Sequence, residues 1–281
     1  MTGQEACPTD RMGTLPNLLE SWHEISNRVQ HARRLALFLD FDGTLAPYRL
    51  RPEESRLPAA SRRALQRLSR RTRVRVWVVS GRSHADVSRK IGIPGVACMG
   101  LYGWDDGRNG HGLSPYPAVA EARAFLADRL RRVHGIRIED KGGAVALHYR
   151  GSPPASVRLA RDLLARVAAE FRTLRVMEGN HTWEVLPREF PGKGRAALAR
   201  WRSIGPDALP IYIGDDVGDE PAFAALSFGI TACACPARRT HARYRLRGPA
   251  EVSRALERLE RELAGDWSVA RHLYLRERGD V

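Results

Sequence analysis

The chain has 281 residues, a length that suits one large or two ordinary domains, and its 43% hydrophobic residues are typical of a globular protein. Its formal net charge is +14. No run is long enough to span a membrane and the polar amino terminus has no signal-peptide core, so we expect no membrane partner. The arginines are dispersed over several predicted helices, which disfavours a nucleic-acid-binding strip. The four cysteines are scattered along the chain, at Cys7, Cys98, Cys233 and Cys235. This spacing favours reduced thiols and a cytoplasmic protein.

Apolar runs separated by amphipathic segments predict alternating strands and helices in the first and last thirds of the chain. The first part is expected to hold a helix at 14–30, a strand at 35–39, a helix at 59–71, a strand at 74–79, a helix at 83–91 and a strand at 96–99. The pattern returns with a helix from 193 to about 203, a strand at 211–213, a helix at 220–226, a strand at 228–232 and a helix at 249–263. This alternation predicts an α/β core with a parallel sheet.

The middle of the chain follows a different order. It predicts a helix at 118–133, strands at 136–138 and 144–149, a helix from 154 to 171, and strands at 174–177 and 182–186. Gly179-Asn180 is a tight hairpin signal between the last two strands. We therefore expect an inserted α+β cap domain at 114–188, between core segments at 1–113 and 189–281.

Four short polar segments stand out against these elements. Three directly follow predicted strands, and the other begins a predicted helix: Asp40-Phe41-Asp42-Gly43-Thr44, Ser80-Gly81-Arg82, Lys193-Gly194, and Gly214-Asp215-Asp216-Val217-Gly218-Asp219-Glu220. Open α/β sheets bind ligands at the carboxyl ends of their strands, so these side chains are expected to gather there. Carboxylates, a hydroxyl and an ammonium suit a magnesium-assisted phosphoryl transfer through an acyl-phosphate.

Each segment also has a plainer interpretation. Asp40 and Asp42 lie on the same side of an extended segment, but a lone Asp-x-Asp-Gly is also a helix-capping turn. The acidic run after residue 214 suits a helix amino terminus, although capping needs fewer carboxylates. Ser80 stands in an ordinary Ser-Gly turn, and Lys193 could be an exposed turn residue. A lysine at a helix start is unfavourable to the helix dipole, which hints at another task.

Together the four segments resemble the haloacid dehalogenase (HAD) superfamily, and the stretch between the second and third resembles trehalose-6-phosphate phosphatases. The resemblance covers about 35–259 and implies a Rossmann-like HAD core with a C2-type cap. It implies that Asp40 attacks phosphorus and that Asp42 protonates the leaving oxygen and then activates water. Lys193 would neutralise the phosphate and the nucleophile. Phe41, Ser80, Gly81 and Arg82 would join both aspartates around the substrate phosphate.

A magnesium ion fits this scheme, because a carboxylate nucleophile approaching a phosphate dianion needs a cation and Mg²⁺ prefers oxygen ligands. We expect Asp40, the backbone carbonyl of Asp42 and Asp215 to bind it. Asp216 and Asp219 are expected to orient a metal-bound water or Lys193.

The cap strings Glu139-Asp140-Lys141, Ala146-Leu147-His148-Tyr149-Arg150 and Trp183-Glu184-Val185-Leu186-Pro187 are similar to those of the family. The resemblance implies that Glu139, Lys141, Arg150 and Glu184 hydrogen-bond the hydroxyls of the distal glucose. Charged groups suit that task, although surface salt bridges across an antiparallel sheet would also account for them.

Two positions depart from the family's usual residues: Gly218 replaces a threonine, and Tyr102-Gly103 stands where a His-Gly pair is usual. The second departure faces the expected sugar side. The resemblance thus implies an enzyme releasing trehalose and phosphate from trehalose 6-phosphate in trehalose biosynthesis. Alternatives are a phosphatase of another glycosyl phosphate (sucrose-, glucosylglycerol- or mannosylglycerate-type), a phosphosugar mutase, or an inactive sugar-phosphate sensor. The oligomeric state is left open, with a monomer as one option.

Overall fold

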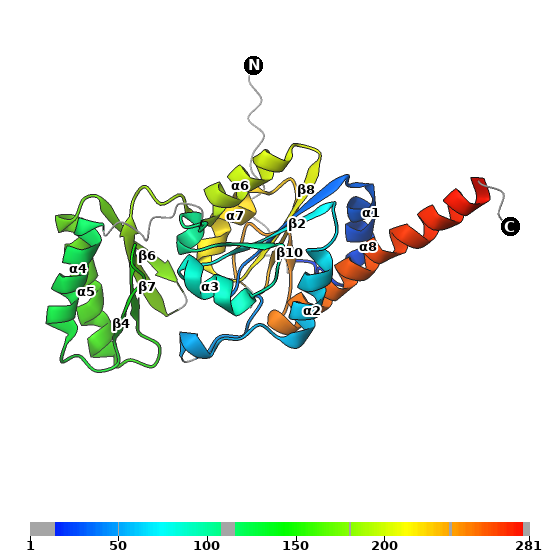
Figure 1. Ribbon diagram of the computed structural model, residues 1–281. Coiled ribbons are helices and arrows are strands. Elements are labelled where there is room, and N and C mark those ends of the chain that lie inside the picture. The colour runs from blue at the N-terminus through cyan, green and yellow to red at the C-terminus, as the bar shows by residue number, and fades with distance from the viewer. Residues whose placement is uncertain (1–14, 50, 108–115, 180, 236–237, 278–281) are drawn as a thin grey trace, which may run out of the picture.

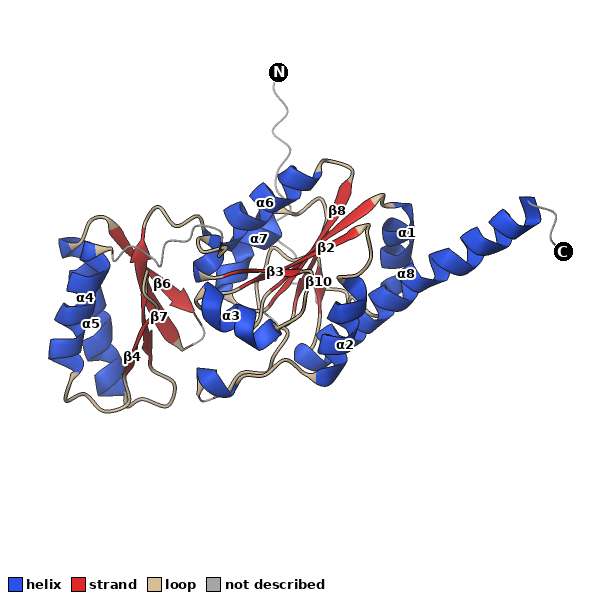
Figure 2. Ribbon diagram, viewed as in Figure 1, coloured by secondary structure: helices blue, strands red, loops and turns tan. Residues whose placement is uncertain are grey.

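The computed structural model describes residues 15–49, 51–107, 116–179, 181–235 and 238–277. These residues form a large part around one sheet and a smaller part around a second sheet, side by side (Figure 1). Figure 2 shows helices on both sides of the larger sheet and on one side of the smaller one.

The larger sheet has six strands in the order β10-β9-β8-β1-β2-β3, and every neighbouring pair is parallel. Its carboxyl edge therefore collects the residues that follow each strand. Its strands are β1 (Arg34–Leu39), β2 (Val74–Val79), β3 (Val96–Met99), β8 (Ala208–Gly214), β9 (Ile230–Cys233) and β10 (Tyr244–Arg245).

Strand β1 shows why helices cover both faces of this sheet. Leu35 and Leu37 pack on one face and Ala36 and Phe38 on the other, and all four are fully buried. Burial of a leucine or phenylalanine side chain contributes about 1.5–3 kcal/mol. One face is covered by α1 (Trp22–His31), α2 (Ala59–Leu68), α3 (His84–Ile91) and α8 (Pro249–Glu277), and the other by α6 (Gly192–Ile204) and α7 (Glu220–Ala225).

The smaller part is an antiparallel sheet in the order β4-β5-β7-β6 with two helices packed on one face. Leu147 and Trp183 lie opposite each other in neighbouring strands and belong to the apolar cluster under these helices. Its elements are α4 (Pro117–Leu130), β4 (Arg137–Asp140), β5 (Val145–His148), α5 (Pro154–Glu170), β6 (Leu174–Gly179) and β7 (Thr182–Pro187). The predicted fold class, a parallel α/β core with an α+β cap, is confirmed.

Two predicted helix bounds differ from the structure by more than five residues. The helix expected from residue 14 begins at Trp22, because the preceding backbone pairs with β10: the N–H of Leu18 donates to the carbonyl of Arg245, and the N–H of Arg245 donates to Pro16. The last helix continues to Glu277, past its expected end at residue 263, and extends away from the sheet (Figure 1).

The cysteine prediction was wrong for one pair. Cys233 and Cys235 form a disulfide, Cys98 is free and buried, and Cys7 lies outside the described residues. Residues two apart at the end of an extended strand point to the same side, which brings these thiols together. The cysteines therefore no longer support a reducing compartment. Within the described part of the chain, no helix is both long and apolar enough to cross a membrane.

Candidate active site

A cavity opens between the carboxyl edge of the core sheet and the cap sheet, and charged side chains from both parts line it. The core contributes Asp40, Asp42, Tyr48, Ser80, Arg82 and Lys193, and the cap contributes Glu139, Lys141, His148, Arg150, Thr182 and Glu184. The segments that the sequence singled out are therefore neighbours in space.

Asp40 and Lys193 form a buried ion pair at the base of this cavity. Asp40 directly follows β1, and its N–H donates to the carbonyl of Ile213 in β8. The Nζ of Lys193 lies 2.8 Å from Oδ1 of Asp40 and 2.8 Å from Oδ1 of Asp219. Burial lowers the pKa of Lys193, but the charges of Asp219 and Asp40 outweigh it and raise that pKa. The side chain of Lys193 is therefore held as an ammonium.

Asp215 directly follows β8 and is held by two hydroxyls from the loop after β1. Thr44 donates to its Oδ1 at 2.7 Å, and Tyr48 donates to its Oδ2 at 3.0 Å. Gly43 makes this approach possible: its φ is +86°, and a Cβ there would lie 2.2 Å from Oδ2 of Asp215. The glycine of the first motif thus makes room for the carboxylate of the fourth.

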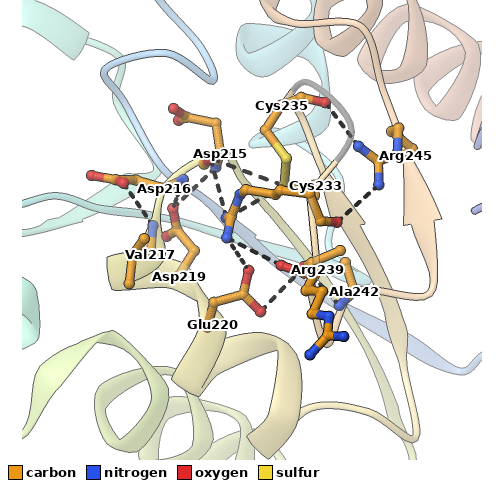
Figure 3. Close-up of a disulfide and its surroundings, with 12 residues drawn as sticks. Asp215, Asp216, Val217, Asp219, Glu220, Cys233, Cys235, Arg239, Ala242 and Arg245 are labelled. Carbon is orange, nitrogen blue, oxygen red and sulfur yellow. Dashed lines mark hydrogen bonds and ion pairs between the residues drawn. A yellow bond between two sulfur atoms is a disulfide. The ribbon is translucent and has the colours of Figure 1, made fainter. Parts of the chain in front are cut away.

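Asp219 is fully buried and uses both oxygens to organise the same loop. Its Oδ2 accepts the backbone N–H groups of Asp215 and Asp216, each at 3.0 Å, as Figure 3 shows. Its Oδ1 accepts the hydroxyl of Tyr212 at 2.7 Å and the ammonium of Lys193. Asp219 therefore ties the loop that carries Asp215 to Tyr212 and Lys193.

Asp40, Asp215 and Asp219 form a cluster of carboxylates whose ligand atoms lie within 4.8 Å of one another. Among the described residues, it is the one cluster with the geometry to hold a metal ion. Three buried carboxylates face the single positive charge of Lys193. Burial and the charge of Asp219 raise the pKa of Asp215 to about 7, and burial raises that of Asp40 well above its ordinary value. A cation would offset this excess negative charge, so the residues fit a metal ion with oxygen ligands.

Asp42 lies on the same loop but has a separate cationic partner. Arg82 donates from Nε and Nη2 to the two carboxylate oxygens of Asp42, at 2.6 and 2.7 Å. Asp86 and the carbonyl of Pro52 accept the other Arg82 contacts, at 2.6 and 2.7 Å. Arg82 therefore lines the cavity with most of its donors already bound to protein.

The remaining residues of the first two motifs lie around this pair. Ser80 is buried at the end of β2, and its hydroxyl accepts the N–H of Arg82 at 3.2 Å. The ring of Phe41 is buried in the core, with the Arg82 guanidinium 5.5 Å from its centroid. Phe41 does not line the cavity with its side chain, so a substrate contact there would come from its backbone.

The four predicted sugar-binding residues of the cap form two pairs and one aromatic contact. Lys141 donates to Oε1 of Glu184 at 2.7 Å and to the core carbonyl of Gly81 at 2.9 Å. Glu139 pairs with His148 at 2.6 Å. Burial raises the pKa of Glu139, but the His148 hydrogen bond and the charge of Lys141 outweigh it and lower the value to about 2. The guanidinium of Arg150 lies over the ring of Tyr48, 5.6 Å from its centroid.

The disulfide lies beside the Asp215 loop (Figure 3). The N–H of Ala234, between the two cysteines, donates to the carbonyl of Gly214 at 2.7 Å. Arg238 lies 2.8 Å from Oε1 of Glu220, and its Nη2 donates to the carbonyl of Asp215 at 3.4 Å. Ala234 and Arg238, which follow β9, therefore hold the backbone of the loop that carries Asp215.

A family model for trehalose-phosphatase matches residues 38–250. The chain belongs to the trehalose-phosphatase family. A trehalose-phosphate phosphatase of Mycobacterium tuberculosis is 33% identical over 277 residues, covering 90% of this chain and 68% of that protein. An uncharacterized glycosyl hydrolase of the same species is 36% identical over 274 residues, and this match spans only 20% of that longer protein. The C-terminal domain of the Candida albicans trehalose-6-phosphate phosphatase shares the fold, with a TM-score of 0.74, 22% identity and coverage of 89% of this chain and 99% of that one.

This trehalose-phosphatase family member has further cavity residues that its motifs do not reveal. Tyr48 lies in a loop with no motif of its own, yet it contacts both Asp215 and Arg150. His148 lies within a family-like string, but its partner Glu139 is nine residues away along the chain. The register Glu139↔Ala146 places His148 two residues along on the same face, so the strand pairing was the missing signal.

The departure at Tyr102 lies on the cavity wall, as expected. Leu101 and Tyr102 both have positive φ, +46° and +59°, a conformation that costs about 1–2 kcal/mol per non-glycine residue. A Cβ on Gly81 would lie 2.8 Å from the Tyr102 hydroxyl. Burial and the charge of Glu184 raise the pKa of Tyr102, so it stays a neutral phenol. The other departure, Gly218, also lines the cavity.

Proposed function

We propose that this chain is a magnesium-dependent phosphatase that hydrolyses trehalose 6-phosphate to trehalose and phosphate through a phospho-aspartate. The observation that carries the proposal is the pairing of Asp40 with Lys193 beside Asp215 and Asp219, beneath a cap whose charged residues face the same cavity. Family membership and the relatives named as phosphatases of this sugar support the substrate assignment.

In the first half-reaction a carboxylate oxygen of Asp40 forms a bond to phosphorus as the ester oxygen leaves, and Asp42 gives its proton to that oxygen. In the second half-reaction Asp42 takes a proton from water while the water oxygen bonds to phosphorus, and the bond to Asp40 breaks. Lys193 keeps positive charge beside the Asp40 carboxylate throughout.

Asp40, Asp215 and the backbone carbonyl of Asp42 would hold the magnesium ion, with Asp219 orienting the loop that carries Asp215. When bound, the ion supplies positive charge for the phosphoryl oxygens. We assign Asp216 a supporting place, since its N–H is anchored on Asp219 and its Oδ1 accepts the N–H of Val217.

The cap is the proposed sugar-binding element, over residues 114–188. Oε1 of Glu184 accepts a hydrogen bond from Lys141, whereas its buried Oε2 has no partner of good hydrogen-bond geometry among the described residues, with the Tyr102 hydroxyl beside the carboxylate. A sugar hydroxyl donating to Oε2 would satisfy that oxygen, and an unmade buried hydrogen bond costs about 1–3 kcal/mol. Glu139 and Arg150 line the same cavity and are proposed to bind further hydroxyls.

A panel of phosphorylated sugars tests the proposal, with phosphate release measured in magnesium and again after chelation. Trehalose 6-phosphate should give the highest kcat/KM, and chelation should abolish turnover. A higher kcat/KM for sucrose phosphate or glucosylglycerol phosphate would reassign the substrate. Binding of trehalose 6-phosphate without phosphate release would instead identify a sensor.

A further inference from the structure

The guanidinium of Arg82 is held from three directions by protein groups. It donates to Asp42 from the loop after β1, to Asp86 in α3, and to the carbonyl of Pro52 at the start of η1 (Pro52–Glu54). Its side chain is only 10% exposed, and the ring of Phe41 lies 5.5 Å from its centre. Such a fixed guanidinium is poorly placed to move toward an incoming phosphate.

The contact with Asp42 is bidentate, with one donor on each carboxylate oxygen. Two parallel N–H donors match the planar geometry of a carboxylate and fix its rotation as well as its place. Asp40, two residues earlier, is paired with Lys193 instead. The two aspartates of the motif therefore have separate cations, which suits two carboxylates with different tasks.

We propose that Arg82 is a positioning residue that holds the Asp42 carboxylate in place as the base for hydrolysis of the phospho-aspartate, and that it is not a ligand of the substrate phosphate. The inference rests on the proposed function and deepens it. In the step concerned, the water oxygen bonds to phosphorus, its proton passes to Asp42, and the bond to Asp40 breaks. Arg82 contributes orientation, because a misplaced base slows proton transfer.

Removal of Arg82 should therefore slow the second half-reaction more than the first. With nitrophenyl phosphate the leaving group departs without needing a proton, so Asp42 is required only for the second step. Arg82→Gln should release one equivalent of nitrophenol per enzyme in a rapid burst and then turn over about 10- to 100-fold more slowly than wild type. KM should stay level or fall, because a slow later step lets the phospho-enzyme accumulate.

The chain offers graded and control variants for this test. Asp86→Asn keeps the Asp42 contact but weakens an anchor of Arg82, so it should show the same pattern to a smaller degree. Arg89→Gln is the matched control, because Arg89 is 76% exposed and binds only the other oxygen of Asp86. It should behave as wild type.

Arg82→Lys separates positioning from folding, since it keeps the charge without the two-donor geometry. If Arg82→Lys has the thermal stability of wild type but still shows the burst and the low turnover, the result supports the proposal. If turnover instead rises and falls with thermal stability across the variants, the proposal is overturned. A raised KM with unchanged kcat in Arg82→Gln would also overturn it and make Arg82 a phosphate ligand. Both results leave the proposed function standing. Wild-type protein that releases no phosphate from any ester would remove the proposed function, and this inference with it.

Discussion

The ammonium of Lys141 in the cap donates to the carbonyl of Gly81 in the core, at 2.9 Å. The same ammonium binds Glu184, so one side chain links a cavity-lining carboxylate of the cap to the loop that follows β2. Its side chain is 8% exposed and that of Glu184 is 7% exposed, so solvent and salt screen this contact less than they would a surface pair. Lys141 thus connects the part proposed to choose the substrate with the part proposed to transform it.

Lys141→Ala should lower kcat/KM for trehalose 6-phosphate far more than for nitrophenyl phosphate, which has no sugar hydroxyls. The loss corresponds to one or two charge-assisted hydrogen bonds, roughly 10- to 100-fold. Parallel assays of the two substrates measure it. Asp42→Ala should depress both activities together, and equal losses in Lys141→Ala would mean that this lysine supports the fold or the chemistry alone.

Gly43→Ala should abolish most turnover by displacing Asp215. The new Cβ would lie 2.2 Å from Oδ2 of Asp215 and 2.3 Å from the ring of Tyr48, at a φ of +86° that alanine adopts poorly. A magnesium titration, with activity as the readout, should show weaker magnesium binding, so that half-maximal activity needs a higher magnesium concentration. Gly151→Ala is the control, because its φ is also positive but nothing lies within 4 Å of the added Cβ. Wild-type magnesium affinity in Gly43→Ala would show that Asp215 does not depend on its close contact with Gly43 to bind the metal ion.

Glu139 should make part of the stability depend on pH. Its pKa is lowered to about 2, so its contribution is complete above its unfolded value near 4.5 and is lost as the pH falls toward 2. The contribution is at most about 3 kcal/mol, and less because a third of the side chain is exposed. Unfolding free energies of Glu139→Gln and wild type should therefore converge over this range.

Asp128→Asn, at an exposed carboxylate in α4, is the control for that comparison and should parallel wild type. A constant gap between Glu139→Gln and wild type from pH 5 to pH 2 would show that the His148 contact contributes no ionisation-linked stability.

The disulfide should contribute to global stability and should also support the loop that carries Asp215. It closes a loop of only a few residues, for which chain entropy predicts about 2 kcal/mol. Cys235→Ala should lower the free energy of unfolding by about that amount and weaken activation by magnesium, because the turn after β9 contacts Gly214 and Asp215. Cys98→Ala tests a cysteine outside the pair. Unaltered magnesium activation in Cys235→Ala would separate the disulfide from the site.

Local pattern was enough to place nine of the ten described strands and the residues that follow them, but it missed β10, which has only two residues. The apolar run before Asp40 predicts a buried parallel strand, and the carboxyl edge of such a sheet brings Asp40, Ser80 and Asp215 close together. The partners of these side chains depend on tertiary geometry. The family resemblance implied that Arg82 contacts the substrate phosphate, and only the folded chain shows that its donors bind Asp42 and Asp86. Tyr48 was missed for the same reason, since a hydroxyl in an irregular loop leaves no periodic signal.

The central claim is a covalent phosphoryl-enzyme at Asp40, and mass spectrometry of rapidly quenched protein tests it most directly. After mixing with trehalose 6-phosphate and magnesium, the peptide containing Asp40 should gain the mass of one phosphoryl group. Asp40→Asn should show no gain and almost no turnover, because the attacking oxygen is lost while the fold is retained. A phosphoryl group on another residue, or full turnover by Asp40→Asn, would contradict the account.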